Sequence, residues 1–79
     1  MRVNILFFGA TAAAIGQRRV EMSVEGDDSA SAVFEKVLEK FPDLSSHRLL
    51  FSVNQEYVSS DTKIRDGDEL AVFTAVSGG

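Results

Sequence analysis

The feature that most constrains the fold is an amphipathic stretch in the middle of the chain, SASAVFEKVLEKFP, residues 29–42. Ser29 is placed to cap a helix here, and Pro42 ends it because the residue before a proline avoids helical backbone angles. Burial of each large apolar residue contributes ~1.5–3 kcal/mol, so this helix needs a sheet to lie on. Its apolar stripe follows helical spacing and consists of Ala30, Val33, Phe34, Val37, Leu38 and Phe41.

The remaining chain supplies that sheet as short strands. Residues 18–25 (RRVEMSVE) alternate between apolar and polar side chains, which is typical of a half-buried strand. Residues 10–16 (ATAAAIG) predict a helical turn, with Thr11 as its N-cap and Gly16 as its end. The other strands are expected at residues 3–8 (VNILFF), 49–53 (LLFSV), 56–58 (EYV) and 69–76 (ELAVFTAV).

The order of these elements is strand, strand, helix, strand, strand, strand. It predicts an α+β fold in two layers, a mixed sheet of about five strands with one main helix packed on one face. This is the pattern of a β-grasp, or ubiquitin-like, roll. With 79 residues in all, we expect a single domain over residues 1–76 and a flexible Gly-Gly tail at residues 77–79.

Composition and charge exclude several classes of function. The net charge of −4 would repel a phosphate backbone and disfavours nucleic acid as a partner. The absence of cysteine excludes disulfides, thiolate metal sites and a cysteine nucleophile. The apolar run in MRVNILFF is too short for a signal peptide, and no stretch is long enough to span a membrane. We therefore expect a cytoplasmic protein without membrane partners.

The polar residues do not form an obvious catalytic or metal-binding set. His47 is the only histidine and is expected to be a solvated loop residue. Asp66, Asp68 and Glu69 cluster around Gly67, but their spacing suits a tight turn better than a metal loop. We expect no bound cofactor, no metal and no catalytic constellation of the chain's own.

The positions of three aromatic residues predict a binding surface more specifically than the polar residues do. Phe8 and Phe73 have the opposite parity to the core-facing residues of their own strands, and Tyr57 is expected on a third strand. A single helix cannot cover both faces of a sheet, so these rings indicate a partner-binding patch on the uncovered face. A one-residue error in the strand register would reverse the two faces and is the alternative.

The chain ends in Val76-Ser77-Gly78-Gly79. Two glycines have no side chains and can thread a narrow channel, which would let another enzyme reach the carboxylate of Gly79. A carboxylate so placed can be activated as an acyl-adenylate. An incidental tail on a plain binding module is the alternative that these four residues leave open.

The whole chain resembles the MoaD-type sulfur carriers, the small subunits of molybdopterin synthase within the MoaD/ThiS family. The matching stretches are ILFFGAT (5–11), the capped helix ending at Phe41-Pro42, VNQEYV (53–58), DGDELAVF (66–73) and VSGG (76–79). The resemblance implies that an ATP-dependent, E1-like enzyme adenylates Gly79 and that sulfur delivery makes it a thiocarboxylate. Val76, Ser77 and Gly78 would then thread into the large synthase subunit, where the sulfur converts cyclic pyranopterin monophosphate to molybdopterin.

The same resemblance implies a heterotetramer in which Phe8, Tyr57 and Phe73 contact the large subunit. The sequence departs from the family pattern at Thr74-Ala75, where prolines are usual, and at Ala12 to Ala14, where charged residues are common. The remaining alternatives are a carrier for thiamin or cysteine synthesis and a ubiquitin-like modifier joined to lysines through Gly79.

Overall fold

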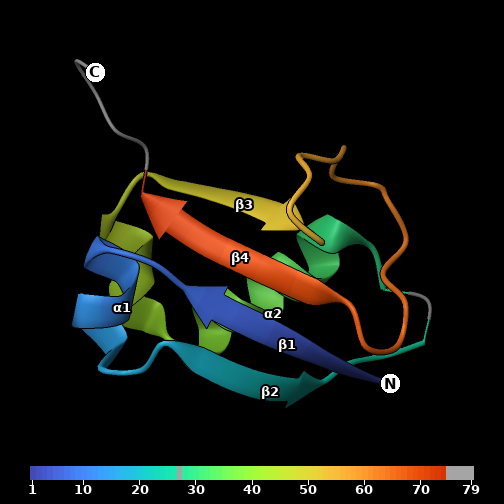
Figure 1. Cartoon of the computed structure of the whole chain (residues 1–79), viewed down its shortest axis with the longest axis horizontal. Helices are drawn as coiled ribbons and strands as arrows, with labels where there is room; N and C mark the ends of the chain where they lie inside the picture. Colours follow the sequence, from blue (N-terminus) through green and yellow to red (C-terminus); the bar gives the residue numbers. More distant parts are fainter. Residues whose placement is uncertain (27, 75–79) are drawn as a thin grey trace.

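A computed structural model describes residues 1–26 and 28–74 of the chain. In this part, four strands form one mixed sheet in the order β2-β1-β4-β3, and the helix α2 lies across one of its faces (Figure 1). The central strands β1 and β4 are parallel, whereas the pairs β1–β2 and β3–β4 are antiparallel. The strands are β1 (Arg2–Phe7), β2 (Arg19–Ser23), β3 (Leu49–Val53) and β4 (Glu69–Thr74).

The main helix, α2 (Ala30–Lys40), forms as its sequence predicts. The Ser29 side chain accepts a hydrogen bond from the Ala32 amide at 3.3 Å, which confirms Ser29 as the N-cap. Pro42 ends the helix and opens a 3₁₀ helix, η1 (Pro42–Ser46), because the fixed backbone angle of proline suits a first helical position.

The core lies between α2 and the sheet. Phe34 of α2 stacks on Phe51 of β3 with ring centroids 4.6 Å apart, and Phe41 meets Phe7 edge to face at 5.4 Å. The predicted apolar stripe therefore faces the sheet. The buried apolar residues are Val3, Ile5, Phe7, Val24, Ala30, Val33, Val37, Leu44, Val53, Ile64, Leu70 and Val72.

A salt bridge ties the segment before α2 to the helix. Lys36 donates a hydrogen bond from Nζ to Oδ2 of Asp28 at 2.7 Å. This hydrogen bond lowers the pKa of Asp28 and raises the pKa of Lys36. Both groups are therefore held in their charged forms at neutral pH.

Two sequence-based expectations are wrong. Residues 56–58 do not form a strand; Asn54 and Gln55 adopt positive φ angles of 50° and 68°, and the chain folds back so that only an isolated bridge joins Val53 to Glu56. The described sheet accordingly has four strands.

The second wrong expectation concerns the cap of the short helix α1 (Ala10–Ile15). The N-cap is Gly9, with φ 56°, so Thr11 lies inside the helix. Gly16 ends the helix as predicted, with φ 75°.

None of the helices in the described ranges is long and apolar enough to cross a membrane.

Candidate functional site

The face of the sheet that α2 leaves uncovered carries the aromatic residues picked out by parity. In β1, Ile5 and Phe7 are buried, while the next residue, Phe8, is 51% exposed. In β4, Val72 is buried and Phe73 is half-buried. The predicted outward placement of Phe8 and Phe73 is confirmed, and the alternative with the two faces reversed is wrong.

These outward residues line a groove of about 470 Å³. We call it the aromatic groove; its lining residues are Leu6, Phe8, Ser52, Gln55, Glu69, Ala71 and Phe73. Tyr57 comes from the loop after β3 rather than from a strand, is 73% exposed, and contacts Phe73 with ring centroids 6.1 Å apart. Phe73 therefore links the three predicted aromatics on one surface.

The strand order places Phe8 and Phe73 of this groove close to the end of β4. Because β1 and β4 are parallel, with Phe7 opposite Val72, the two strands end at the same edge of the sheet. Phe8 follows the end of β1, and Phe73 is the second-last residue of β4. The predicted tail residues Val76, Ser77, Gly78 and Gly79 lie outside the described residues.

A buried hydroxyl, that of Thr11, fixes the ends of these strands. The sequence predicted this residue as the N-cap of α1 instead. Thr11 is fully buried, and its Oγ1 accepts a hydrogen bond from the Phe8 amide at 3.0 Å. The hydroxyl also lies 2.7 Å from the Phe8 carbonyl oxygen and 2.9 Å from that of Val72, so it can donate to either.

The other polar candidates serve the turn before β4. Asp66 accepts a hydrogen bond through Oδ1 from the Arg2 amide at 2.7 Å, and Asp68 accepts one through Oδ2 from the Arg65 amide at 2.8 Å. Gly67 between them has φ 85°, so the interpretation of the acidic cluster as a tight turn is confirmed.

His47 lies elsewhere, at the end of η1, which it caps through its backbone amide. Within residues 1–26 and 28–74, no three histidine, aspartate or glutamate side chains form a group that could hold a metal ion.

Comparisons with known proteins agree with this architecture over the whole chain. A family model described as the ThiS family matches residues 5–79. The molybdopterin synthase sulfur carrier subunit of Mycobacterium tuberculosis is 33% identical, with 100% of this chain and 99% of that protein covered. The human protein of the same name is 31% identical, with 99% and 94% covered.

Among solved structures, SAMP1 from Haloferax volcanii superposes with a TM-score of 0.88 at 26% identity, covering 100% of both chains. The likeness to ubiquitin-like β-grasp proteins confirms the predicted fold class. Because the family match extends from the first strand to the last residue and the curated relatives align over nearly their full length, the chain belongs to the ThiS family.

Proposed function

We propose that this protein is the sulfur carrier subunit of a molybdopterin synthase. The observation that carries the proposal is the end-to-end match with curated sulfur carrier subunits at 31–33% identity, together with a family match that includes Gly79. The position of the aromatic groove, next to the end of β4, supports it. A partner seated on Phe8 and Phe73 would be close to the point where the chain leaves the sheet.

The proposed chemistry takes place on the carboxylate of Gly79. An ATP-dependent, E1-like enzyme binds the tail, and a carboxylate oxygen attacks the α-phosphorus of ATP, releasing pyrophosphate. Sulfide-level sulfur supplied by another protein then attacks the acyl carbon, AMP leaves, and the product is a thiocarboxylate. In the large synthase subunit this sulfur bonds to cyclic pyranopterin monophosphate on the way to molybdopterin. Water then cleaves the acyl–sulfur bond, which leaves the sulfur on the substrate and returns the carboxylate of Gly79.

In this proposal the chain contributes shape and reach rather than catalytic groups. Val76 and Ser77 span the distance from the domain, and Gly78 and Gly79 add no side chains to a narrow channel. The aromatic groove supplies the apolar contact with the large subunit in a cytoplasmic heterotetramer. ATP is a substrate of the activating enzyme, so this chain needs no cofactor of its own.

The likeness to SAMP1 favours a second candidate function. SAMP1 stands for small archaeal modifier protein 1, and the Haloferax volcanii protein is similar to this chain over its full length. As a modifier, this chain would use the same acyl-adenylate of Gly79. The attacking group would then be a lysine amine, and the product would be an isopeptide bond.

Mass measurement after activation distinguishes the two functions. The purified protein is incubated with a candidate activating enzyme, ATP and a sulfur source; a carrier gains the mass that marks replacement of one oxygen by sulfur. Deleting Gly79, or adding one residue after it, should abolish sulfur transfer and leave the circular dichroism spectrum unchanged. A deletion variant that transfers sulfur at the wild-type rate would contradict the proposal, and a conjugate to lysine would favour the modifier.

A further inference from the structure

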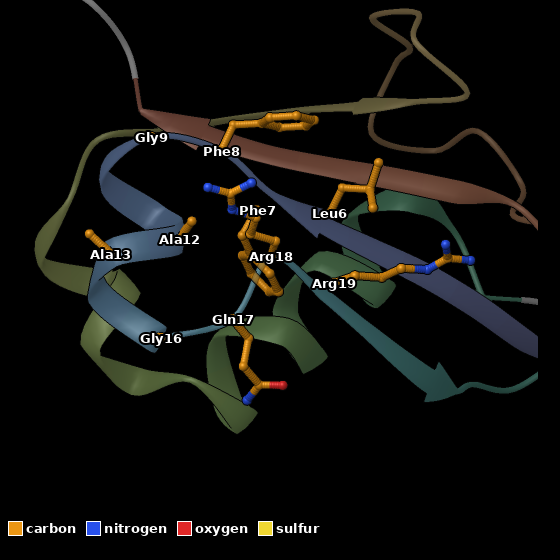
Figure 2. Close-up of a pocket in the computed structure, with 10 residues that line it drawn as sticks. All are labelled: Leu6, Phe7, Phe8, Gly9, Ala12, Ala13, Gly16, Gln17, Arg18 and Arg19. Carbon is orange, nitrogen blue, oxygen red and sulfur yellow. The ribbon is translucent and has the colours of Figure 1, made fainter.

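A second groove adjoins the aromatic groove and has a different chemical character. It has a volume of about 720 Å³ and lies between α1 and the strands β1 and β2 (Figure 2). Leu6 and Phe8 line both grooves, so the two form one continuous surface. We call the second one the arginine groove; its lining includes Leu6, Phe8, Ala12, Gly16, Arg18 and Arg19.

Two exposed arginines give this groove its charge. Arg19 lies opposite Leu6 in the β1–β2 register, which places its side chain on the same uncovered face. Within the described residues, the guanidinium groups of Arg18 and Arg19 have no hydrogen bond or ion pair, whereas that of Arg2 is bonded to Glu21 at 3.1 Å. Two permanent positive charges therefore face the solvent from a groove whose other side chains are apolar except for that of Gln17.

These charges stand out because the chain as a whole carries a net charge of −4. An arginine presents a planar fork of donors that fits a carboxylate, and the apolar floor formed by Leu6 and Phe8 fits a neighbouring hydrophobic side chain. A nucleic acid backbone would be repelled by the remaining acidic surface. The chemistry suits a protein segment in which an acidic residue stands next to an apolar one.

We propose that the arginine groove binds an acidic segment of the large synthase subunit, adjacent to its apolar contact in the aromatic groove. This inference rests on the proposed function. One apolar contact allows the carrier to rotate on its partner, whereas a second, charged contact on the other side of Phe8 fixes the orientation. That orientation directs the end of β4 toward the large subunit, and the paired charges accelerate association at low salt.

A charge-reversal variant tests this, with a matched control. Arg18→Glu/Arg19→Glu changes the net charge by the same amount as Lys40→Glu/Arg65→Glu, whose exposed side chains line neither groove. Titration of each variant against the purified large subunit gives the dissociation constant at low and high salt. We expect roughly 10- to 100-fold weaker binding for Arg18→Glu/Arg19→Glu at low salt and a flatter salt dependence, with the control close to wild type.

A second measurement separates failure of this inference from failure of the proposed function. Thiocarboxylate formation by the activating enzyme is followed by mass in the same proteins, and the expected rate for Arg18→Glu/Arg19→Glu is that of wild type. A wild-type protein that takes up no sulfur would contradict the proposed function itself. A wild-type protein that takes up sulfur, combined with a reversal variant that binds the large subunit normally, would overturn only the groove assignment.

Two further outcomes are decisive. Slower sulfur loading together with normal large-subunit binding would assign the groove to the activating enzyme and overturn the inference. Both arginines are exposed, so the reversal variant should keep the wild-type melting temperature. If it does not fold, the neutral variant Arg18→Gln/Arg19→Gln carries the same test with a smaller expected loss of affinity, and unchanged affinity there would also overturn the inference.

Discussion

Successive residues of each strand point to the two faces of the sheet in turn, yet the two faces differ in their exposure to solvent. On the inner face, Ile5, Phe7 and Val72 are almost fully buried beneath α2 and η1. On the outer face, Phe8 and Leu50 are exposed and Phe73 is half-buried, although these residues are as apolar as those inside. Hydrophobicity therefore does not separate the two sets of residues; the position of the main helix, α2, does.

The comparison shows how a small domain comes to expose apolar residues on one face of its sheet. A chain of 79 residues has one main helix and can cover only one side of its sheet. The apolar residues left on the other side add little to stability while solvent-exposed, because burial is the source of their free energy. In the proposed carrier, that free energy is available for binding a partner.

The largest effect on stability is expected on the inner face. Phe7→Ala removes a buried ring that meets Phe41 at 5.4 Å and should lower the free energy of unfolding by about 3–5 kcal/mol. Leu6→Ala, the neighbouring change on the outer face, is the control and should lower it by about 1 kcal/mol or less. Urea denaturation measures both, and equal losses would contradict the division into two faces.

An intermediate loss of stability is expected at Thr11, whose hydroxyl lies between Phe8 and Val72 at the ends of β1 and β4. Thr11→Val keeps the side-chain shape but removes the hydroxyl that lies 2.9 Å from the Val72 carbonyl oxygen; we expect a loss of about 1–3 kcal/mol. Thr11→Ser retains the hydroxyl and serves as the matched variant in the same denaturation experiment. A valine variant more stable than the serine variant would show that the hydrogen bonds of this hydroxyl are unimportant.

The smallest effect on stability is expected on the outer face, at Phe73. Phe73→Ala removes a half-buried ring and should cost about 1 kcal/mol or less in urea denaturation, yet weaken binding to the large subunit by at least roughly tenfold. Titration with the large subunit measures the second quantity. Ser23→Ala, at an exposed position of the edge strand β2, is a control for both. An unfolded Phe73→Ala protein would contradict the outward placement of this ring.

Much of the fold was predictable because its signals are local. The helix of residues 30–40 follows from the spacing of its apolar residues, from Ser29 and from Pro42. The strands near residues 3–8, 18–25, 49–53 and 69–76 follow from alternation, and each forms within a few residues of its expected bounds in the described chain. The expected strand at residues 56–58 failed because two residues with positive φ at Asn54 and Gln55 turn the chain back on itself.

The sequence by itself therefore determined the type and order of the main elements, and the parity of Phe8 and Phe73, since periodicity is a property of neighbouring residues. Only the tertiary structure decided that Thr11 lies buried across two strand ends, that Tyr57 reaches Phe73 from a loop, and that Arg18 and Arg19 border a groove shared with Phe8. Each of these depends on which strands become neighbours. Strand pairing is set by long-range packing around α2, and no local pattern in the chain encodes it.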